Sequence, residues 1–296
     1  MPAEILCVGE VLWDALPAGL FLGGAPLNVA CHLAAMGQSV AFASRVGEDE
    51  LGREIGRRLV RRGMSTDLIQ VDAKLETGFV IVELDEEGTP RFAIVEPSAW
   101  DAIAPEKELL DDAGAAGAIV FGSLAQRDER SRQTIQRLWE TEATRVFDVN
   151  LRPPFDHRGV VEDSLKAAHL VKLNDDELAR LCGWFGLPQS LQGGALALAQ
   201  EFDCQTVCVT RGSDGAALWH GAAWIDHPGF RVDVIDTVGS GDAFLAALLT
   251  GLLREDDPAD TLATANALGA YVATRPGATP THDQEAIARI RESHKR

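Results

Sequence analysis

The fold of this chain is decided at Asp236-Thr237-Val238-Gly239-Ser240-Gly241-Asp242-Ala243-Phe244, where a turn of small residues opens an apolar helical run that continues to Leu253. The first N–H groups of a helix have no partner within it, and with the helix dipole they form an anion site. Glycines let a phosphate approach this backbone closely. Asp242 falls in the first turn, where a carboxylate can accept the proton of an attacking hydroxyl. The pattern predicts phosphoryl transfer, although a tight turn with Asp242 as a helix-start residue has the same appearance.

Two other nucleotide-binding patterns can be tested by reading the sequence. The chain has no GxxxxGK[ST] segment, which excludes a P-loop enzyme. The glycine turn also lacks GxGxxG and lies late in the chain, which argues against a dinucleotide site after the first strand.

Outward from this turn, short apolar runs alternate with amphipathic stretches. We expect buried strands at Ile5 to Val8, Val40 to Ala43, Ala118 to Phe121, Val146 to Val149, Leu170 to Leu173 and Val207 to Thr210. We expect helices near 28–36, 50–62, 130–140, 175–182, 191–202, 241–253 and 259–273. Such alternation predicts a single α/β domain over 1–296, with a central mostly parallel sheet flanked by helices. Ligands then bind beyond the carboxyl ends of the strands.

One region breaks the alternation. Thr77–Leu84 and Pro90–Val95 form a hairpin pattern with no helix between them. The first arm is apolar on both faces, so each face must be covered. A small β lid built from about 12–22 and 76–97 would satisfy this, packed over a substrate or against a partner subunit.

A second glycine-rich segment, Gly23-Gly24-Ala25-Pro26-Leu27-Asn28, precedes a predicted helix. Its backbone is open to a polar ligand, and Asn28 can both donate and accept hydrogen bonds to a sugar hydroxyl. Asp14 follows an apolar run ending at Trp13 and adds a carboxylate that could hold two hydroxyls. Each of these residues, taken singly, also fits a turn or a helix cap.

Composition limits the partners. The chain carries 27 Lys plus Arg against 45 Asp plus Glu, a net charge of −18, and so it should repel a nucleic acid backbone. No signal peptide or membrane-spanning run is apparent, so we expect a soluble, cytoplasmic protein with no membrane partner. Five cysteines without a CxxC pair argue against a disulfide framework or a zinc site.

Together, the Gly23-Gly24 segment with Asn28 and the stretch from Asp236 to Asp242 resemble the two signatures of the PfkB (ribokinase-like) carbohydrate kinases. The order and spacing agree over essentially the whole chain. The resemblance implies a ribokinase-like three-layer fold with the small β-sheet lid, and an ATP-dependent kinase that uses Mg²⁺. Asp242 would be the general base, and the amides of Gly239, Ser240, Gly241 and Asp242 the anion hole.

The resemblance also implies roles for intermediate segments. The NxxE-like element places Asn174 near the nucleotide phosphates, with Glu177 acting on magnesium through water. The nucleotide would be held by Thr210, Gly212, Gly215 and Asn266. A monovalent cation, K⁺ in this interpretation, would be bound largely by carbonyl oxygens of Asp236, Val238, Ala273 and Gly277.

Three local segments are similar to the fructokinase branch: Gly9 to Asp14, Asp148 to Pro153 and Pro97 to Asp101. There, Asp14, Gly23, Gly24 and Asn28 would hold the sugar, Arg91 would reach over it from the hairpin, and Arg152 would face the transferring phosphate. The segment between Asp14 and Gly23 is short, and no Asn precedes Pro97-Ser98, where Trp100 follows instead. These departures leave open 2-keto-3-deoxygluconate, another ketose or a nucleoside as the acceptor. A non-catalytic sugar or nucleotide sensor is the alternative outside the enzymes, and a homodimer through the lid is a further expectation.

Overall fold

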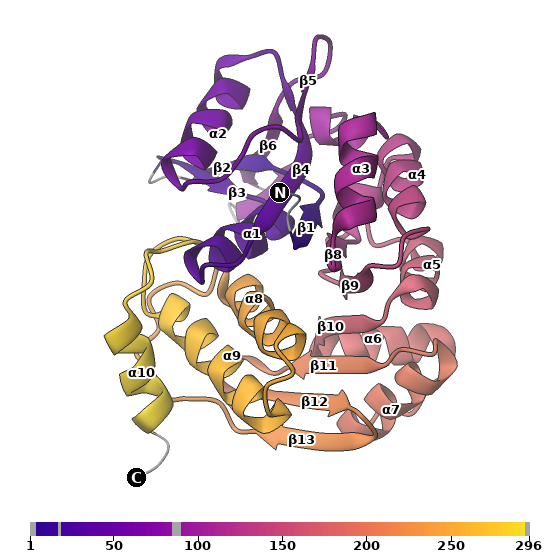
Figure 1. The fold of residues 1–296 in the computed structure, drawn as a ribbon, viewed down its shortest axis with the longest axis vertical. Coiled ribbons are helices and arrows are strands. Elements are labelled where there is room, and N and C mark those ends of the chain that lie inside the picture. The colour runs from indigo at the N-terminus through magenta and orange to yellow at the C-terminus, as the bar shows by residue number, and fades with distance from the viewer. Residues whose placement is uncertain (1–3, 17–18, 85–89, 294–296) are drawn as a thin grey trace.

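The computed structural model describes residues 4–16, 19–84 and 90–293, and these form two sheets covered by helices (Figure 1). The main sheet has nine strands in the order β13-β12-β11-β10-β9-β8-β1-β4-β5. The strands are β1 (Ile5–Val8), β4 (Val40–Gly47), β5 (Ile69–Asp72), β8 (Ala118–Gly122), β9 (Thr144–Asp148), β10 (Leu170–Asn174), β11 (Thr206–Thr210), β12 (Ala216–His220) and β13 (Ala223–His227). Five of the six predicted apolar runs lie wholly in these strands, and the sixth, Val146 to Val149, extends one residue beyond β9. The pairing is parallel from β5 to β11 and antiparallel only at β12 and β13, which confirms the predicted fold class.

The alternation of side chains along the strands explains why helices cover both faces. In β1, Leu6 and Val8 belong to one buried apolar cluster, whereas Ile5 and Cys7 belong to another. Successive strand residues point to opposite faces, so each face must be covered by apolar side chains of helices.

Two sets of helices provide this cover. One face packs against α3 (Lys107–Ala115), α4 (Glu129–Leu138), α5 (Arg158–Ala167), α6 (Asp175–Phe185) and α7 (Leu191–Glu201). The other packs against α1 (Ala25–Ala35), α2 (Glu50–Arg61), α8 (Ser240–Leu253), α9 (Pro258–Ala273) and α10 (Gln284–Ser293). In the described residues no helix is both long and apolar enough to cross a membrane.

The second sheet is the small β-sheet that the hairpin pattern predicts. Its order is β3-β2-β6-β7, formed by β2 (Leu12–Leu16), β3 (Gly19–Gly23), β6 (Gly78–Leu84) and β7 (Pro90–Ile94). The β2–β3 and β6–β7 pairs are antiparallel, and β2 joins β6 in parallel. Asp14 lies inside β2 rather than after a strand. Its neighbour Trp13 is buried and donates its Nε1–H to Leu51 O. The loop expected at 85–89 lies outside the described residues.

Helices α3, α5 and α10 and strands β5, β12 and β13 were not expected from the sequence. Helix α3 buries only Leu109 and Ala113, so its sequence lacks a clear apolar period that would predict a helix. Packing against the sheet, rather than local propensity, fixes such a helix.

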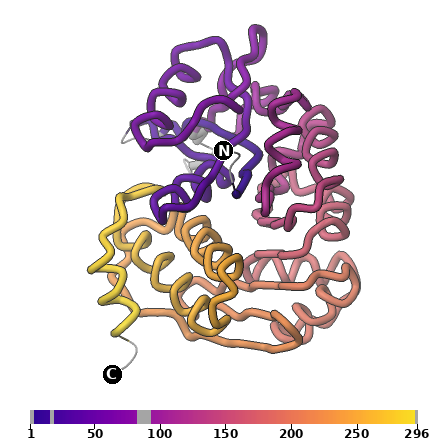
Figure 2. Tube along the Cα trace, in the orientation of Figure 1, coloured from indigo at the N-terminus to yellow at the C-terminus, as the bar shows by residue number. Residues whose placement is uncertain are grey.

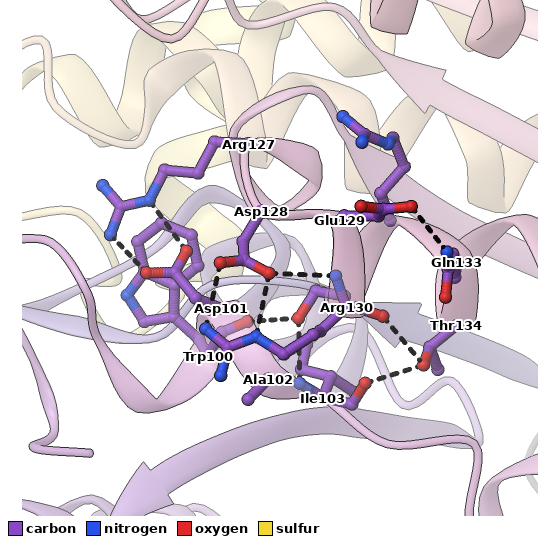
Figure 3. A network of polar contacts seen from close by, with 12 residues as sticks. Trp100, Asp101, Ala102, Ile103, Arg127, Asp128, Glu129, Arg130, Gln133 and Thr134 are labelled. Atoms are coloured by element: carbon purple, nitrogen blue, oxygen red, sulfur yellow. Dashed lines mark hydrogen bonds and ion pairs between the residues drawn. The ribbon is translucent and has the colours of Figure 1, made fainter.

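A buried ion pair anchors the base of the small sheet to the main one (Figure 3). Arg127 donates from Nε and Nη2 to the two carboxylate oxygens of Asp101, both at 2.8 Å, and also from Nη2 to Val95 O. Its guanidinium lies 3.9 Å from the centroid of the Trp100 ring, which has 0% exposure. Trp100 is therefore part of the core packing at the point where the sequence departs from the fructokinase branch.

We expect Arg127→Met to lower the free energy of unfolding by about 3–5 kcal/mol, because the Asp101 carboxylate would stay buried without its counter-charge. Urea unfolding measures this loss. The matched control is Arg130→Met, which breaks a more exposed pair with Asp128 at 2.9 Å and should cost at most ~1 kcal/mol. Equal losses in the two variants would contradict an anchoring role for Arg127.

Candidate active site

The glycine turn begins helix α8 at the carboxyl edge of the main sheet. Gly239 caps the helix with φ of +78°, a left-handed conformation that favours glycine. A Cβ at this position would also overlap the Ala278 carbonyl. The turn therefore fits closely against the segment that follows α9. Ser240 and Gly241 begin α8, and Ser240 N donates to Thr237 O at 3.2 Å within the turn. This geometry is suited to holding an anion at the helix N-terminus.

Asp242 lies at the third position of α8, beside helix α1. Asn28 Nδ2 donates to Asp242 Oδ2 at 2.8 Å, so two segments 214 residues apart meet at this carboxylate. Burial raises the pKa of Asp242 to about 6, and the nearby Asp148 charge adds to this increase. Lys172, Asn28 and Arg152 act in the opposite direction. Asp242 is consequently a weak base that is largely ionised at neutral pH.

A buried lysine balances the carboxylates around Asp242. Lys172 Nζ on β10 lies 3.1 Å from Asp148 Oδ1 at the end of β9, and both side chains are nearly inaccessible. Burial alone would lower the pKa of Lys172, but the charges of Asp148, Asp242 and Glu177 outweigh it and raise this pKa. Lys172 therefore remains a cation beside the glycine turn. No role for Lys172 or Asp148 follows from the sequence motifs. A lysine within the apolar strand Leu170–Asn174 is nevertheless a visible signal of a functional residue.

The sugar-side residues of the sequence prediction gather around the start of α1. Gly24 has φ of +116°, and a Cβ there would overlap the Glu10 carbonyl. A Cβ on Gly23 would lie 2.5 Å from Asp14 Oδ2, so Gly23 leaves room for this carboxylate. Burial raises the pKa of Asp14, and the positive charge of Arg152 opposes the rise.

Glu10 is a further buried carboxylate that the sequence reasoning missed. Its Oε1 accepts a hydrogen bond from Ala25 N at 3.3 Å, whereas its buried Oε2 has no hydrogen-bond partner within the described residues. Burial raises the pKa of Glu10 to about 7. The sequence signal for it is an acidic residue two positions after the apolar strand Ile5–Val8.

Arg152 lies in the exposed segment after β9, and its Nη1 donates to Leu151 O at 3.0 Å. Its charge lowers the pKa values of Glu10, Asp14 and Asp242 against the effect of burial. The guanidinium is therefore within electrostatic reach of the sugar-side and base-side carboxylates alike. For Arg91 the structure describes the backbone in β7 but not the side chain, so its predicted contact with the sugar lies outside the described part.

The predicted nucleotide residues lie on neighbouring strand ends. Asn174 and Thr210 are register partners at the ends of β10 and β11. Asn174 caps α6, and the oxygens of Glu177 accept hydrogen bonds from Asn174 N at 2.9 Å and Leu151 N at 2.8 Å. Gly212 and Gly215 flank the turn after β11, both with positive φ.

Asn266 comes from a different element. It is buried on α9 and donates to Leu262 O in its own helix at 2.8 Å. Across the residues that the structure describes, no hydrogen bond joins it to Asn174 or Thr210. Helix α9 does approach the glycine turn, since a Cβ on Gly269 would lie 3.1 Å from Ser240 O.

The four residues predicted to hold a monovalent cation are close together. Asp236 accepts hydrogen bonds from Val238 N through Oδ1 and from Gly277 N through Oδ2, both at 3.0 Å. The Ala273 carbonyl accepts from Asp236 N at 3.2 Å and from Ile235 N at 2.8 Å. Because these oxygens already accept backbone N–H groups, cation binding by this cluster stays a prediction.

An anion-binding helix start with a carboxylate in its first turn, at the carboxyl edge of a mostly parallel sheet, defines a phosphotransferase of the α/β class. Comparison with known proteins identifies the family within this class. Residues 17–285 match the family described as pfkB family carbohydrate kinase. The chain belongs to this family, and it is an ATP-dependent carbohydrate kinase.

Individual relatives cover nearly all of the chain. A fructokinase of Klebsiella pneumoniae is 32% identical over 302 residues, which is 94% of this chain and 95% of the relative. An aminoimidazole riboside kinase of Salmonella typhimurium is 30% identical and covers 86% of this chain and 83% of its own length. The structure of a Vibrio cholerae O395 fructokinase with fructose, ADP and calcium ion has a TM-score of 0.83 at 28% identity, covering 97% of this chain and 98% of that one.

The contact between the glycine turn and Ala278 can be tested with Gly239→Ala. Gly37 has the same φ of +78° but nothing within 4 Å of an added Cβ, so Gly37→Ala is a matched control. The control should cost about 1–2 kcal/mol of unfolding free energy for its conformation. Gly239→Ala should cost about 1–3 kcal/mol more because the turn must move away from Ala278. Chemical denaturation measures both, and identical losses would mean that the close approach is unimportant.

Proposed function

We propose that this kinase transfers the γ-phosphate of ATP to a hydroxyl of fructose. The observation that carries the proposal is the Asn28–Asp242 hydrogen bond, which joins the sugar-side helix to the first turn of the anion-binding helix. A fructokinase relative and a structural neighbour with fructose and ADP support the same substrates.

In this proposal the sugar lies between the small sheet and the start of α1. Asp14 and Asn28 bind its hydroxyls, while Gly23 and Gly24 leave room beside the backbone. Arg91 reaches over the sugar from β7. A carboxylate and an amide can together satisfy several hydroxyl donors and acceptors, as a polar and buried ligand requires.

Asp242 is the proposed general base. With a pKa of about 6 it is mostly a carboxylate at pH 7, yet basic enough to accept a proton as the acceptor hydroxyl attacks phosphorus. Asn28 donates to one carboxylate oxygen and orients it, which leaves the other for the substrate.

The charge of the transferring group would be stabilised by three kinds of donor. The amides from Gly239 to Asp242 form the anion hole, Arg152 binds phosphate oxygens, and Lys172 supplies a buried positive charge. Asn174, Thr210, Gly212, Gly215 and Asn266 would hold the rest of ATP.

Metal ions complete the proposed site. Asp148 Oδ2 is buried and has no hydrogen-bond partner in the described residues, so the site offers an oxygen of the kind that Mg²⁺ prefers. Bound Mg²⁺ would neutralise charge on the ATP phosphates. Glu177 would influence it only indirectly, because both its oxygens accept backbone N–H groups. K⁺ would bind at Asp236, Val238, Ala273 and Gly277 and stabilise the turn.

The small sheet would act as a lid that excludes water during transfer. Its edge strand β3 exposes Leu20, which is 46% accessible, and a second copy of this chain packed there would form a homodimer through the lid. We place the protein in the cytoplasm, where ATP is available and its five free, buried thiols stay reduced.

A nucleoside is the second candidate acceptor, because a 30% identical relative is an aminoimidazole riboside kinase. ADP release with Mg-ATP and a panel of fructose, ribose, 2-keto-3-deoxygluconate and adenosine separates the candidates. Selective turnover of fructose is the expected result. Selective turnover of another acceptor would overturn the sugar assignment alone, whereas no turnover with ATP still bound would favour the sensor.

Asp242→Asn should lower kcat with the preferred acceptor by at least ~100-fold, since general base catalysis contributes on the order of 10²–10⁴. Titration calorimetry should find ATP and sugar still bound, because the amide keeps the shape of the carboxylate. Asp233→Asn removes a charge from an exposed position on the same loop and serves as the control. Near-normal turnover in Asp242→Asn would remove Asp242 from the proposed role.

A further inference from the structure

A pocket of about 380 Å³ lies between helix α2, strand β3 and the segment after α9. We name it the arginine pocket; its lining is Phe21, Leu22, Arg58, Arg61, Arg62, Pro276, Gly277, Ala278, Thr279 and Pro280. Three guanidinium groups thus face one cavity that has no carboxylate among its lining residues. In a chain with a net charge of −18, such a concentration of positive charge is unexpected.

The contacts of these arginines fix them around the pocket. Arg58 lies 4.6 Å above the Trp13 ring and donates from Nε to Glu54 at 3.1 Å. Arg62 donates from Nη2 to Thr279 O at 3.1 Å and to Thr279 Oγ1 at 2.8 Å. Glu54 also lies 3.6 Å from Arg61, so Arg58 and Arg61 share one carboxylate. In the described residues, these bonds use only part of each guanidinium and leave other N–H donors for a ligand.

Two histidines lie next to the pocket, behind Ala278. After burial, the charge of Arg62 is a further cause that lowers the pKa values of His32 and His282. His32 Nδ1 and His282 Nε2 lie 2.9 Å apart, and His32 Nε2 lies 3.0 Å from Ala278 O. Both imidazoles are therefore neutral at pH 7, and they add no charge beside the arginines.

We propose that the arginine pocket is a second ligand site, separate from the catalytic one, that binds a phosphate-bearing anion. Guanidinium groups match phosphate oxygens in paired hydrogen bonds. A cavity of about 380 Å³ falls within the usual range for small-molecule sites and exceeds what a bare phosphate fills. The apolar side chains of Phe21, Leu22 and Pro276 offer contact to a small organic group. Asp14, Asn28 and Asp242 do not line this pocket, and Gly277 is the one lining residue that it shares with the proposed cation cluster.

The pocket and the catalytic turn share one wall. Arg62 donates to Thr279. The neighbouring Ala278 packs against Gly239, and its carbonyl oxygen lies 3.0 Å from Nε2 of His32, which is one helical turn after Asn28. Figure 2 shows how the yellow segment after α9 returns to the indigo N-terminal part of the chain. A ligand in the arginine pocket therefore touches the segment against which the anion hole is built.

Calorimetric titration of the full chain with inorganic phosphate, with a hexose phosphate and with the unphosphorylated hexose tests the proposal. We expect saturable binding of at least one phosphate probe in wild type. Arg61→Gln and the double variant Arg61→Gln/Arg62→Gln should weaken it, the latter at least ~10-fold. Arg57→Gln is the matched control, because Arg57 lies on the same helix, pairs with Glu50 and Glu54, and does not line the pocket.

Comparison of the two phosphate probes identifies the source of the anion. Tighter binding of the hexose phosphate supports an organic phosphate held partly by Phe21 and Leu22, and equal binding supports free phosphate. No saturable binding of either probe would overturn the proposal. Equal affinity in the arginine variants and in Arg57→Gln would also overturn it, because binding would then lie elsewhere, such as at the catalytic turn. The readout is binding, so it does not depend on which acceptor the kinase uses.

Discussion

The packing of the α8 N-terminus against two other segments is the constraint on which the candidate site depends. Gly239 leaves no space between its own backbone and Ala278, and Asp242 meets Asn28 from α1 at 2.8 Å. The first contact holds the amides of the turn in place, and the second holds the carboxylate. The second contact requires α1 and α8 to pack side by side on the same face of the main sheet (Figure 1), and the first requires the segment after α9 to return to the start of α8.

Charge balance is the second condition for such a site. Three carboxylates, Asp148, Glu177 and Asp242, surround the buried ammonium of Lys172 and raise its pKa. The lysine in turn limits how far burial can raise the pKa of Asp242. A buried base without this cation would be protonated more readily and would accept protons less often. The three carboxylates can therefore lie close together because the ammonium group of Lys172 lies among them.

The small sheet meets the main body through packing as well as through chain connections. The Arg127–Asp101 ion pair lies beside the Trp100 ring (Figure 3), and Arg127 also donates to Val95 O directly after β7. Trp100 is wholly buried, and a Cβ on Gly78 of β6 would collide with its ring. Trp100 therefore contributes to packing between the small sheet and the main body.

The sequence by itself determined the class of fold, the glycine turn and the family. Apolar runs alternating with amphipathic stretches, and glycines at φ values that side chains disfavour, are local signals and can be read without coordinates. Only the tertiary structure decided that Asp14 lies within a strand, that Lys172 and Glu10 lie near Asp242, and that three arginines at the C-terminal end of α2 line a pocket with residues 276–280. These features arise from contacts between segments up to 217 residues apart. Burial and charge proximity, which set the pKa values, exist only once the chain is folded.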